Sequence, residues 1–173
     1  MATIKSIETA GWSAVPDGRL VLSSGLNVIL GPNEAGKSSL VSAIMAALYE
    51  DGGTCSEAFR QRYRRWNDSG PFFVRLELEN GAGSFVLIRD FGEKTNSLTG
   101  PDGKSLRDKR KIASVVEDLV GLPTLRSFTA SACMQQEEVS AVCGEPSLRE
   151  LLERQIAGAG SDTTALLKRL DKA

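Results

Sequence analysis

The fold of this chain is decided by the stretch Gly31-Pro32-Asn33-Glu34-Ala35-Gly36-Lys37-Ser38. Its spacing is G-x-x-x-x-G-K-S, the pattern of a phosphate-binding loop, or P-loop, which lies between a buried strand and a helix. The apolar run 26–30 before it has the length of a buried strand, and 39–49 after it reads as a buried helix. A chance match in a glycine-rich turn is the alternative, and both flanking segments argue against it.

The two glycines of the loop permit backbone angles and close approaches that a Cβ would prevent. Successive N–H groups of such a loop point at one anion, and the positive end of the following helix adds to the attraction. In this pattern Lys37 reaches the β- and γ-phosphates of a nucleotide, and the Ser38 hydroxyl binds Mg²⁺. We therefore predict that Gly31–Ser38, continued by Ser39, binds a nucleotide.

Composition and charge describe an ordinary soluble protein. The 173 residues suffice for one domain, or one domain with an appendage. Hydrophobic residues make up 41%, charged residues 25%, and the formal net charge is −1, so no global basic field indicates nucleic acid. Neither a signal peptide nor an apolar run near the roughly 20 residues of a membrane span is present, which predicts a cytoplasmic protein without membrane contact.

The cysteine and histidine content excludes several kinds of site. Cys55, Cys133 and Cys143 form no C-x-x-C pair, and the chain has no histidine. Structural zinc is therefore not expected, and the cysteines are expected to be reduced and mostly buried. Catalysis by Ser-His-Asp or Cys-His is excluded.

The remaining chain predicts strands first and helices later. Asn80–Gly83 reads as a hairpin turn between strands at 72–78 and 84–89, and these two with 94–98 are predicted to form an antiparallel meander. Ser105–Asp108 resembles a capping box that opens a helix ending at Gly121. The predicted strands are 4–8, 19–22, 72–78, 84–89, 94–98 and 129–134, and further helices are expected after 146 and from 163 to the end.

The segment Phe59–Trp66 interleaves four arginines with three aromatic residues. One interpretation is contact with a phosphate backbone, with aromatic rings placed for stacking on bases. The other is a solvated charged face whose aromatic residues anchor a connecting segment to the core. The sequence leaves both interpretations open.

An acidic Mg²⁺ ligand of the Walker B kind, four apolar residues followed by Asp, is missing. In the run Phe85–Asp90 an arginine, Arg89, stands where the aspartate is required, and the hairpin assigns this run to the meander. Val115–Asp118 has only two apolar residues before its acids and belongs to a helical pattern. Neither run is accepted as Walker B.

Taken together, the loop GPNEAGKS, a meander ending in Ile88–Phe91, and the run Ser131–Val139 resemble the N-terminal half-head of SMC-like coiled-coil ATPases, of the SbcC and YhaN type found in DNA repair. The resemblance covers essentially the whole chain. It implies an α/β fold, namely an ABC-type P-loop NTPase lobe with an antiparallel β subdomain at 1–145. A helical arm at 146–173 would form the root of a truncated coiled coil.

The resemblance also implies roles for individual residues. Gln136 would be the Q-loop glutamine, which binds Mg²⁺ and senses the γ-phosphate, and with Lys37 it would be catalytic. Gln135 stands where relatives usually have a basic residue, so the register is either Gln135 or Gln136. Asn33 would orient the γ-phosphate or water, and Glu34 replaces a commoner glycine.

The function implied is ATP binding with Mg²⁺ by half of an ATPase. Hydrolysis would require a C-terminal lobe with the signature motif and Walker B, and an ATP-dependent homodimer with a second head. DNA and a nuclease subunit would be further partners, with the protein near the nucleoid if bacterial. The alternatives are a self-contained small P-loop NTPase or kinase, with Arg60–Arg65 as its lid, and an interaction module that uses no nucleotide.

Overall fold

The computed structural model describes residues 2–133. The chain divides into two units, Met1–Pro123 and Thr124–Ala173. The predictions for Met134, Gln135, Gln136, Cys143 and the helices expected after 146 lie outside the described residues.

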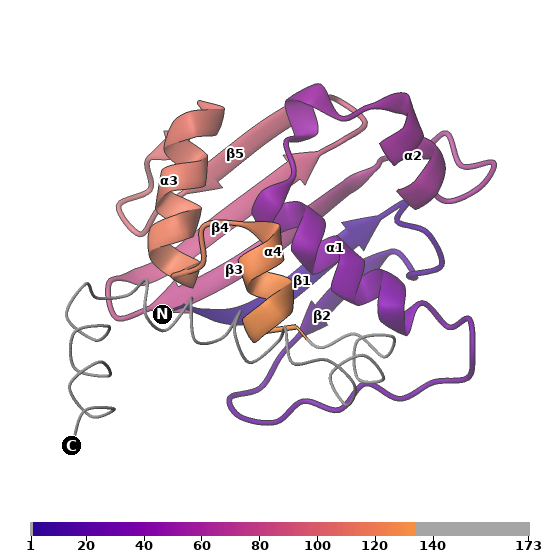
Figure 1. Cartoon of the computed structure of the whole chain (residues 1–173), viewed down its shortest axis with the longest axis horizontal. Helices are drawn as coiled ribbons and strands as arrows, with labels where there is room; N and C mark the ends of the chain where they lie inside the picture. Colours follow the sequence, from indigo (N-terminus) through magenta and orange to yellow (C-terminus); the bar gives the residue numbers. More distant parts are fainter. Residues whose placement is uncertain (1, 134–173) are drawn as a thin grey trace, which may run out of the picture. The chain divides into compact units, whose positions relative to one another are not determined.

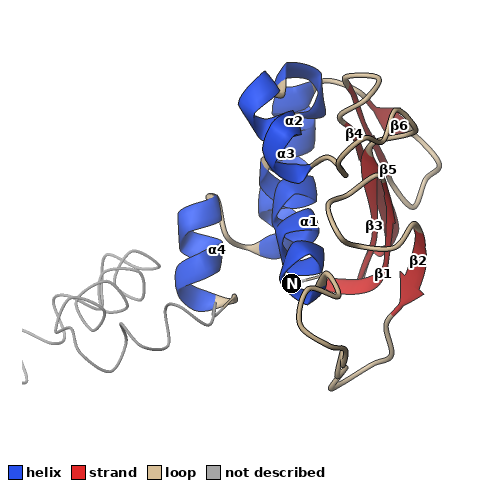
Figure 2. Cartoon of the chain, turned by 90° about the vertical axis from the view of Figure 1, so that its right-hand side faces the viewer, coloured by secondary structure: helices blue, strands red, loops and turns tan. Residues whose placement is uncertain are grey.

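The first unit is an antiparallel sheet with helices on one of its faces (Figures 1 and 2). The strand order is β2-β1-β3-β4-β5-β6, and every neighbouring pair is antiparallel. The strands are β1 Thr3–Ala10, β2 Gly18–Val21, β3 Phe73–Asn80, β4 Gly83–Asp90, β5 Thr95–Thr99 and β6 Ser105–Leu106. The helices are α1 Lys37–Tyr49, the 3₁₀ turn η1 Gly52–Thr54, α2 Glu57–Tyr63 and α3 Lys109–Val120.

The core lies between the sheet and its helices, and the alternation of the strands builds it. In β3 the side chains of Val74, Leu76 and Leu78 are buried, and Leu76 pairs with buried Leu87 of β4. The helices add Leu40, Ala43, Ala46, Ala47 and Leu48 from α1 and Ile112, Val116 and Leu119 from α3. The strands predicted at 4–8, 19–22, 72–78, 84–89 and 94–98 are confirmed, as are the Asn80–Gly83 hairpin and the helix at 39–49.

The helix α3 begins later than the sequence pattern indicated. The predicted capping box at Ser105–Asp108 is wrong, because Ser105 and Leu106 pair with β5 as the edge strand β6. The helix instead begins after Asp108, whose carboxylate accepts hydrogen bonds from the N–H groups of Arg110 and Lys111, both at 3.0 Å. Its end at Gly121 is confirmed, with φ of 75°.

The predicted strand at 26–30 is wrong within this structure. These residues form no ladder, and Leu26 and Leu30 are 89% and 87% exposed. A strand needs a neighbour for its N–H and C=O groups, and no strand among residues 2–133 pairs beyond β2 on that edge. The side chain of Asn27 instead closes a local turn on Ser23, and the segment loops away from β2 before α1 begins (Figure 1).

The second unit begins with the helix α4, Leu125–Ser131. The strand predicted at 129–134 is therefore wrong over 129–131. A reciprocal capping box explains the helix, since Ser127 N–H donates to Thr124 Oγ1 and Thr124 N–H donates to Ser127 Oγ, both at 3.1 Å. The residues of this box are small and polar, so a search for apolar patterns does not reveal the start of the helix.

Candidate nucleotide-binding site

The glycine loop leads directly into α1, and Gly36 is its N-cap residue. Gly36 has φ of 86°, in the left-handed region, and a Cβ built on it would lie 2.8 Å from the carbonyl oxygen of Ala14. Glycine is therefore required at this position for both conformation and space. Glu34 is also left-handed, with φ of 65°, a conformation that glycine adopts more readily than glutamate.

The N-terminus of α1 has the properties of an anion site. No side chain caps it, and its first turn carries no acidic residue. The first N–H groups of a helix have no partner within the helix, and the helix dipole makes this end positive. The Ser38 side chain is exposed on this turn, where its hydroxyl can act as a metal ligand.

Lys37 joins the two ends of the loop. Its ammonium donates to the carbonyl oxygens of Gly31 at 2.8 Å and Pro32 at 2.6 Å. Asn33 and Ala35 are exposed between these points, and the Ala35 N–H donates to the Pro32 carbonyl at 3.4 Å. All the residues predicted for the loop thus lie around one helix end, with the lysine folded onto the loop backbone.

A turn after β1 supports the first turn of α1 from behind. The Trp12 indole donates to Ser39 O at 3.0 Å and Ser42 Oγ at 3.3 Å, and Ser39 Oγ donates to Ser13 Oγ at 3.3 Å. Trp12 is completely buried. Sequence reasoning missed Trp12 and Ser13, because the only local signal was the turn residue Gly11.

A cavity of about 390 Å³ lies at the far end of α1, and a second cavity of about 290 Å³ opens beside the loop. The second one is bordered by the loop, by the exposed apolar run and by the edge of the sheet, so it combines apolar walls with the Lys37 ammonium. Its lining includes Ile29, Leu30, Ala35, Gly36, Lys37 and Leu40, together with residues of β1 and β2.

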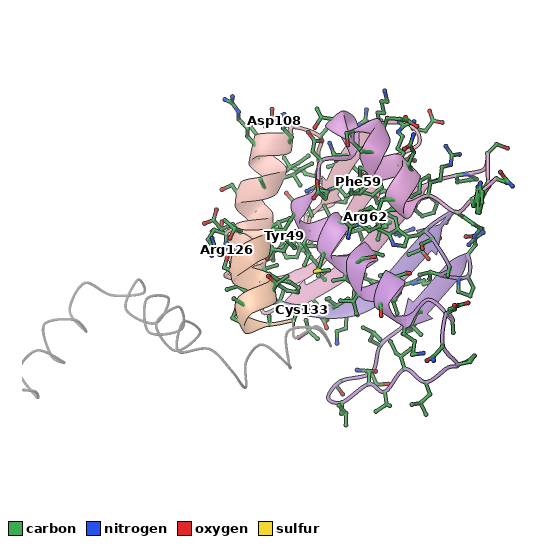
Figure 3. The ribbon with its side chains drawn as sticks, turned by 45° about the vertical axis from the view of Figure 1, so that its right-hand side comes forward. Tyr49, Phe59, Arg62, Asp108, Arg126 and Cys133 are labelled. Carbon is green, nitrogen blue, oxygen red and sulfur yellow. The ribbon has the colours of Figure 1, made fainter. Side chains whose placement is uncertain are left out.

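The segment Phe59–Trp66 divides between core and surface. Phe59 and Tyr63 pack on Trp12, with ring centroids 6.0 and 5.1 Å away. Arg60 donates to the Phe91 carbonyl at 2.8 Å. The anchoring interpretation is therefore confirmed for Phe59 and Tyr63, whereas Arg60 is bound to the fold rather than free on a solvated face. Figure 3 shows Phe59 and Arg62 on the same helix, α2, and Arg62 is exposed.

Arg65 is fixed by the turn that supports α1. Its guanidinium contacts both carboxylate oxygens of Asp17, at 2.8 and 3.2 Å, and the Val15 carbonyl at 2.6 Å. The hydrogen bond from Arg65, together with one from the Gly11 N–H, lowers the pKa of Asp17 below its ordinary value. This pair connects the loop at 64–70 with the loop that carries Pro16.

The rejected Walker B runs lie where the sequence placed them. Phe85–Asp90 belongs to β4, and Val115–Asp118 belongs to α3. Arg89 is buried and donates to the Ala47 carbonyl at 3.0 Å, and burial lowers its pKa to about 10. Within the described part of the chain, no group of three acidic, histidine or cysteine side chains is placed to hold a metal.

Two further observations concern the state of the cysteines and the length of the helices. Cys55 and Cys133 are half-buried and are not joined in a disulfide. No helix within residues 2–133 is long and apolar enough to cross a membrane.

A glycine-rich loop that leads into the uncapped N-terminus of a helix, with that helix packed on a sheet, is typical of P-loop proteins. The sequence profile of the AAA domain matches residues 10–172, so this chain belongs to that family. A Rad50 ATPase of DNA double-strand break repair from Pyrococcus abyssi is 25% identical over 76% of the chain. The corresponding protein of Thermococcus kodakarensis is 27% identical over 79%, and the SbcC component of the nuclease SbcCD from Deinococcus radiodurans is 30% identical over 78%.

The chain spans only 15 to 16% of the length of these three curated relatives. The similarity to Rad50 and SbcC proteins confirms the resemblance to SMC-like ATPases of the SbcC type that the loop, the meander and the run 131–139 indicated.

Proposed function

We propose that this chain is the ATP-binding N-terminal half of an SMC-like DNA-repair ATPase, and that Gly31–Ser39 binds the nucleotide. The observation that carries the proposal is the uncapped N-terminus of α1, which Gly36, Lys37 and Ser38 form together. The names of the relatives, ATPases of DNA double-strand break repair and a component of a nuclease, support ATP as the nucleotide.

The residues present fit ATP with Mg²⁺. A Cβ at Gly36 would clash with the Ala14 backbone, so glycine sets the shape of the loop, and the first-turn N–H groups of α1 have no side-chain cap. Lys37 would exchange the carbonyls of Gly31 and Pro32 for phosphate oxygens. Ser38 would hold Mg²⁺, with Gln136 or Gln135 as the second predicted ligand, and the bound ion would neutralise phosphate charge.

Hydrolysis is proposed to need further parts of the protein. No accepted acidic ligand for Mg²⁺ lies in residues 2–133, so a C-terminal lobe with Walker B and the signature motif would supply it. The run 26–30 supports this assignment, since its exposed apolar side chains and unpaired backbone lie beside the open edge of β2. A strand of the second lobe would bury these apolar side chains and would form hydrogen bonds with the unpaired backbone.

The finer assignments form part of the same proposal. The described unit would be an ABC-type N-terminal lobe, and 146–173 would be the root of the coiled coil. Two heads would dimerise on ATP, with DNA and a nuclease subunit as partners, in the cytoplasm or at the nucleoid. A self-contained NTPase or kinase is disfavoured, because the arginines Arg60 and Arg65 that its lid would need are engaged in the fold.

The test is Mg·ATP binding and turnover by the full 173-residue chain, measured by calorimetry and by phosphate release. Charged hydrogen bonds of this kind contribute about 1.5–3 kcal/mol, so Lys37→Ala is expected to weaken binding roughly 10- to 100-fold. Lys111→Ala, which replaces an exposed lysine on α3, is the matched control and should bind as the parent does. Turnover should be negligible in all three.

Two results would contradict this proposal. Equal affinities for the parent and Lys37→Ala would mean that the loop is not the nucleotide site. Rapid turnover by the isolated chain would mean that a complete catalytic set is present without a second lobe.

A further inference from the structure

A tryptophan on the surface of the first unit lies in full contact with solvent. Trp66 is 92% exposed, whereas Trp12, the other tryptophan of the chain, is completely buried. Single exposed apolar residues are common on proteins and need no explanation. Trp66 differs from a chance exposure in two respects, which are how its loop is held and what surrounds it.

The loop that carries Trp66 is fastened on both sides of the indole. The Arg65 N–H donates to the Gly11 carbonyl at 2.8 Å, and the Arg65 guanidinium is held by Asp17 and the Val15 carbonyl. On the other side, the Asp68 carboxylate lies 3.5 Å from the fixed Arg65 guanidinium and accepts a hydrogen bond from the Gly70 N–H at 2.7 Å. The backbone thus presents the indole from a fixed position, which lowers the entropy cost of binding a ligand there.

The surroundings of Trp66 are polar and rich in arginine. It borders a cavity of about 520 Å³, whose other lining residues are Glu57, Arg60, Gln61, Arg64, Arg65, Asn67 and Asp68. None of these is apolar. Arginine is common in protein interfaces, but the core of such an interface is depleted in charged residues, and five of these seven residues are charged. This environment therefore does not favour a protein partner.

The charges of this surface favour an anionic ligand. Arg62 lies on α2 next to this cavity's residues but does not line the cavity. It forms no ion pair with any residue in 2–133, and its guanidinium lies 5.2 Å from the centre of the Tyr63 ring. Arg64 donates to the Gly70 carbonyl at 2.8 Å, and its Nε is buried without a hydrogen-bond partner. The acidic residues here are Glu57 and Asp68, and Asp68 is engaged by Arg65 and Gly70.

We propose that Arg62, Arg64 and Trp66, called here the arginine–tryptophan surface, bind single-stranded DNA. A base would stack on the Trp66 indole, and Arg62 would contact a neighbouring phosphate. Stacking on an exposed ring requires bases that are not already stacked in a duplex, which favours single strands. The proposal rests on the proposed function, because DNA repair in the names of the relatives indicates DNA as the nucleic acid.

The experiment is a titration of the full chain with dye-labelled oligothymidylate, without nucleotide, followed by fluorescence anisotropy and by intrinsic fluorescence. Stacked bases quench tryptophan, and the buried Trp12 should not respond, so quenching reports Trp66. Trp66→Ala is expected to weaken binding by roughly ten-fold or more, and Trp66→Phe, which keeps an aromatic face, by less.

The role of Arg62 is tested by salt. Each phosphate contact contributes about 0.7 to the slope of log K against log salt for single strands, so Arg62→Gln should reduce that slope by about this amount. Arg107→Gln is the matched control, because Arg107 is also exposed and lies between β6 and α3, in a different part of the chain from α2 and the Trp66 loop. Both replaced side chains are on the surface, so folding should be unaffected.

Unchanged affinity in Trp66→Ala, or an equal loss in Arg107→Gln, would overturn the proposal. Self-association that Trp66→Ala abolishes, with DNA binding unchanged, would assign the indole to a protein contact and would also overturn it. Because no nucleotide is present, these results are independent of whether Lys37→Ala abolishes ATP binding. The two proposals can therefore fail separately.

Discussion

Replacement of Gly36 by alanine tests whether the backbone at Ala14 sets the shape of the phosphate loop. The new Cβ would lie 2.8 Å from Ala14 O, 2.9 Å from Ala14 C and 3.0 Å from Val15 N. A left-handed conformation costs a non-glycine residue about 1–2 kcal/mol, and overpacking against fixed backbone adds about 1–3 kcal/mol. Gly36→Ala should therefore lower the free energy of unfolding by about 2–5 kcal/mol.

The matched control is Gly103→Ala. Gly103 also has a left-handed φ, 75°, but a Cβ there would meet no atom within 4 Å. It should lose only the conformational part, about 1–2 kcal/mol. Urea unfolding followed by tryptophan fluorescence measures both variants, because burial of Trp12 gives a signal for the native state. Equal losses in the two variants would refute the claim that contact with Ala14 requires glycine at Gly36.

Two further predictions concern the turn behind the loop. Trp12→Phe removes the donor to Ser39 O and Ser42 Oγ and leaves a smaller ring. The free energy of unfolding in urea should therefore fall by about 2–3 kcal/mol, and calorimetry should show a weaker affinity for Mg·ATP. Unchanged values for both would show that the indole does not support α1. Asp17→Asn should cost about 0.5–1 kcal/mol at pH 7, since the pair with Arg65 is partly exposed. The folded pKa of Asp17 is lowered, so this contribution is complete above the unfolded value of about 3.9 and is lost as pH falls through the folded pKa. The stability difference between parent and Asp17→Asn should accordingly shrink below about pH 4, and a difference that stays constant to about pH 2.5 would contradict this role.

Local patterns predicted the meander well, because its information is local. The alternation in β3 and β4 and the turn at Asn80–Gly83 specify both the pairing and the buried face without help from distant residues. The helix α1 was likewise predictable, since a glycine loop before an apolar segment specifies where it starts. The roles assigned to Lys37, Ser38 and Gln136 stay predictions.

The errors at 105–108 and 26–30 have a common cause, which is a choice between neighbouring segments that the sequence does not show. The sequence at Ser105 and Leu106 matches the start of a helix, but these residues pair with β5 and form a strand. The apolar run 26–30 has the composition and length of a strand, but within residues 2–133 it has no strand to pair with. A ladder is a property of two segments, and one segment cannot reveal it.

The sequence by itself determined that a phosphate loop precedes a helix, that three strands form a meander, and that Gly36 must be glycine in such a loop. Only the tertiary structure decided which residues support that loop and which remain on the surface. Phe59, Tyr63 and Trp66 are all aromatic residues of one arginine-rich segment, yet the first two pack on Trp12 and the third faces solvent. The reason is physical: burial depends on the surface that the rest of the chain brings to a side chain, and Trp12 reaches only one side of this segment.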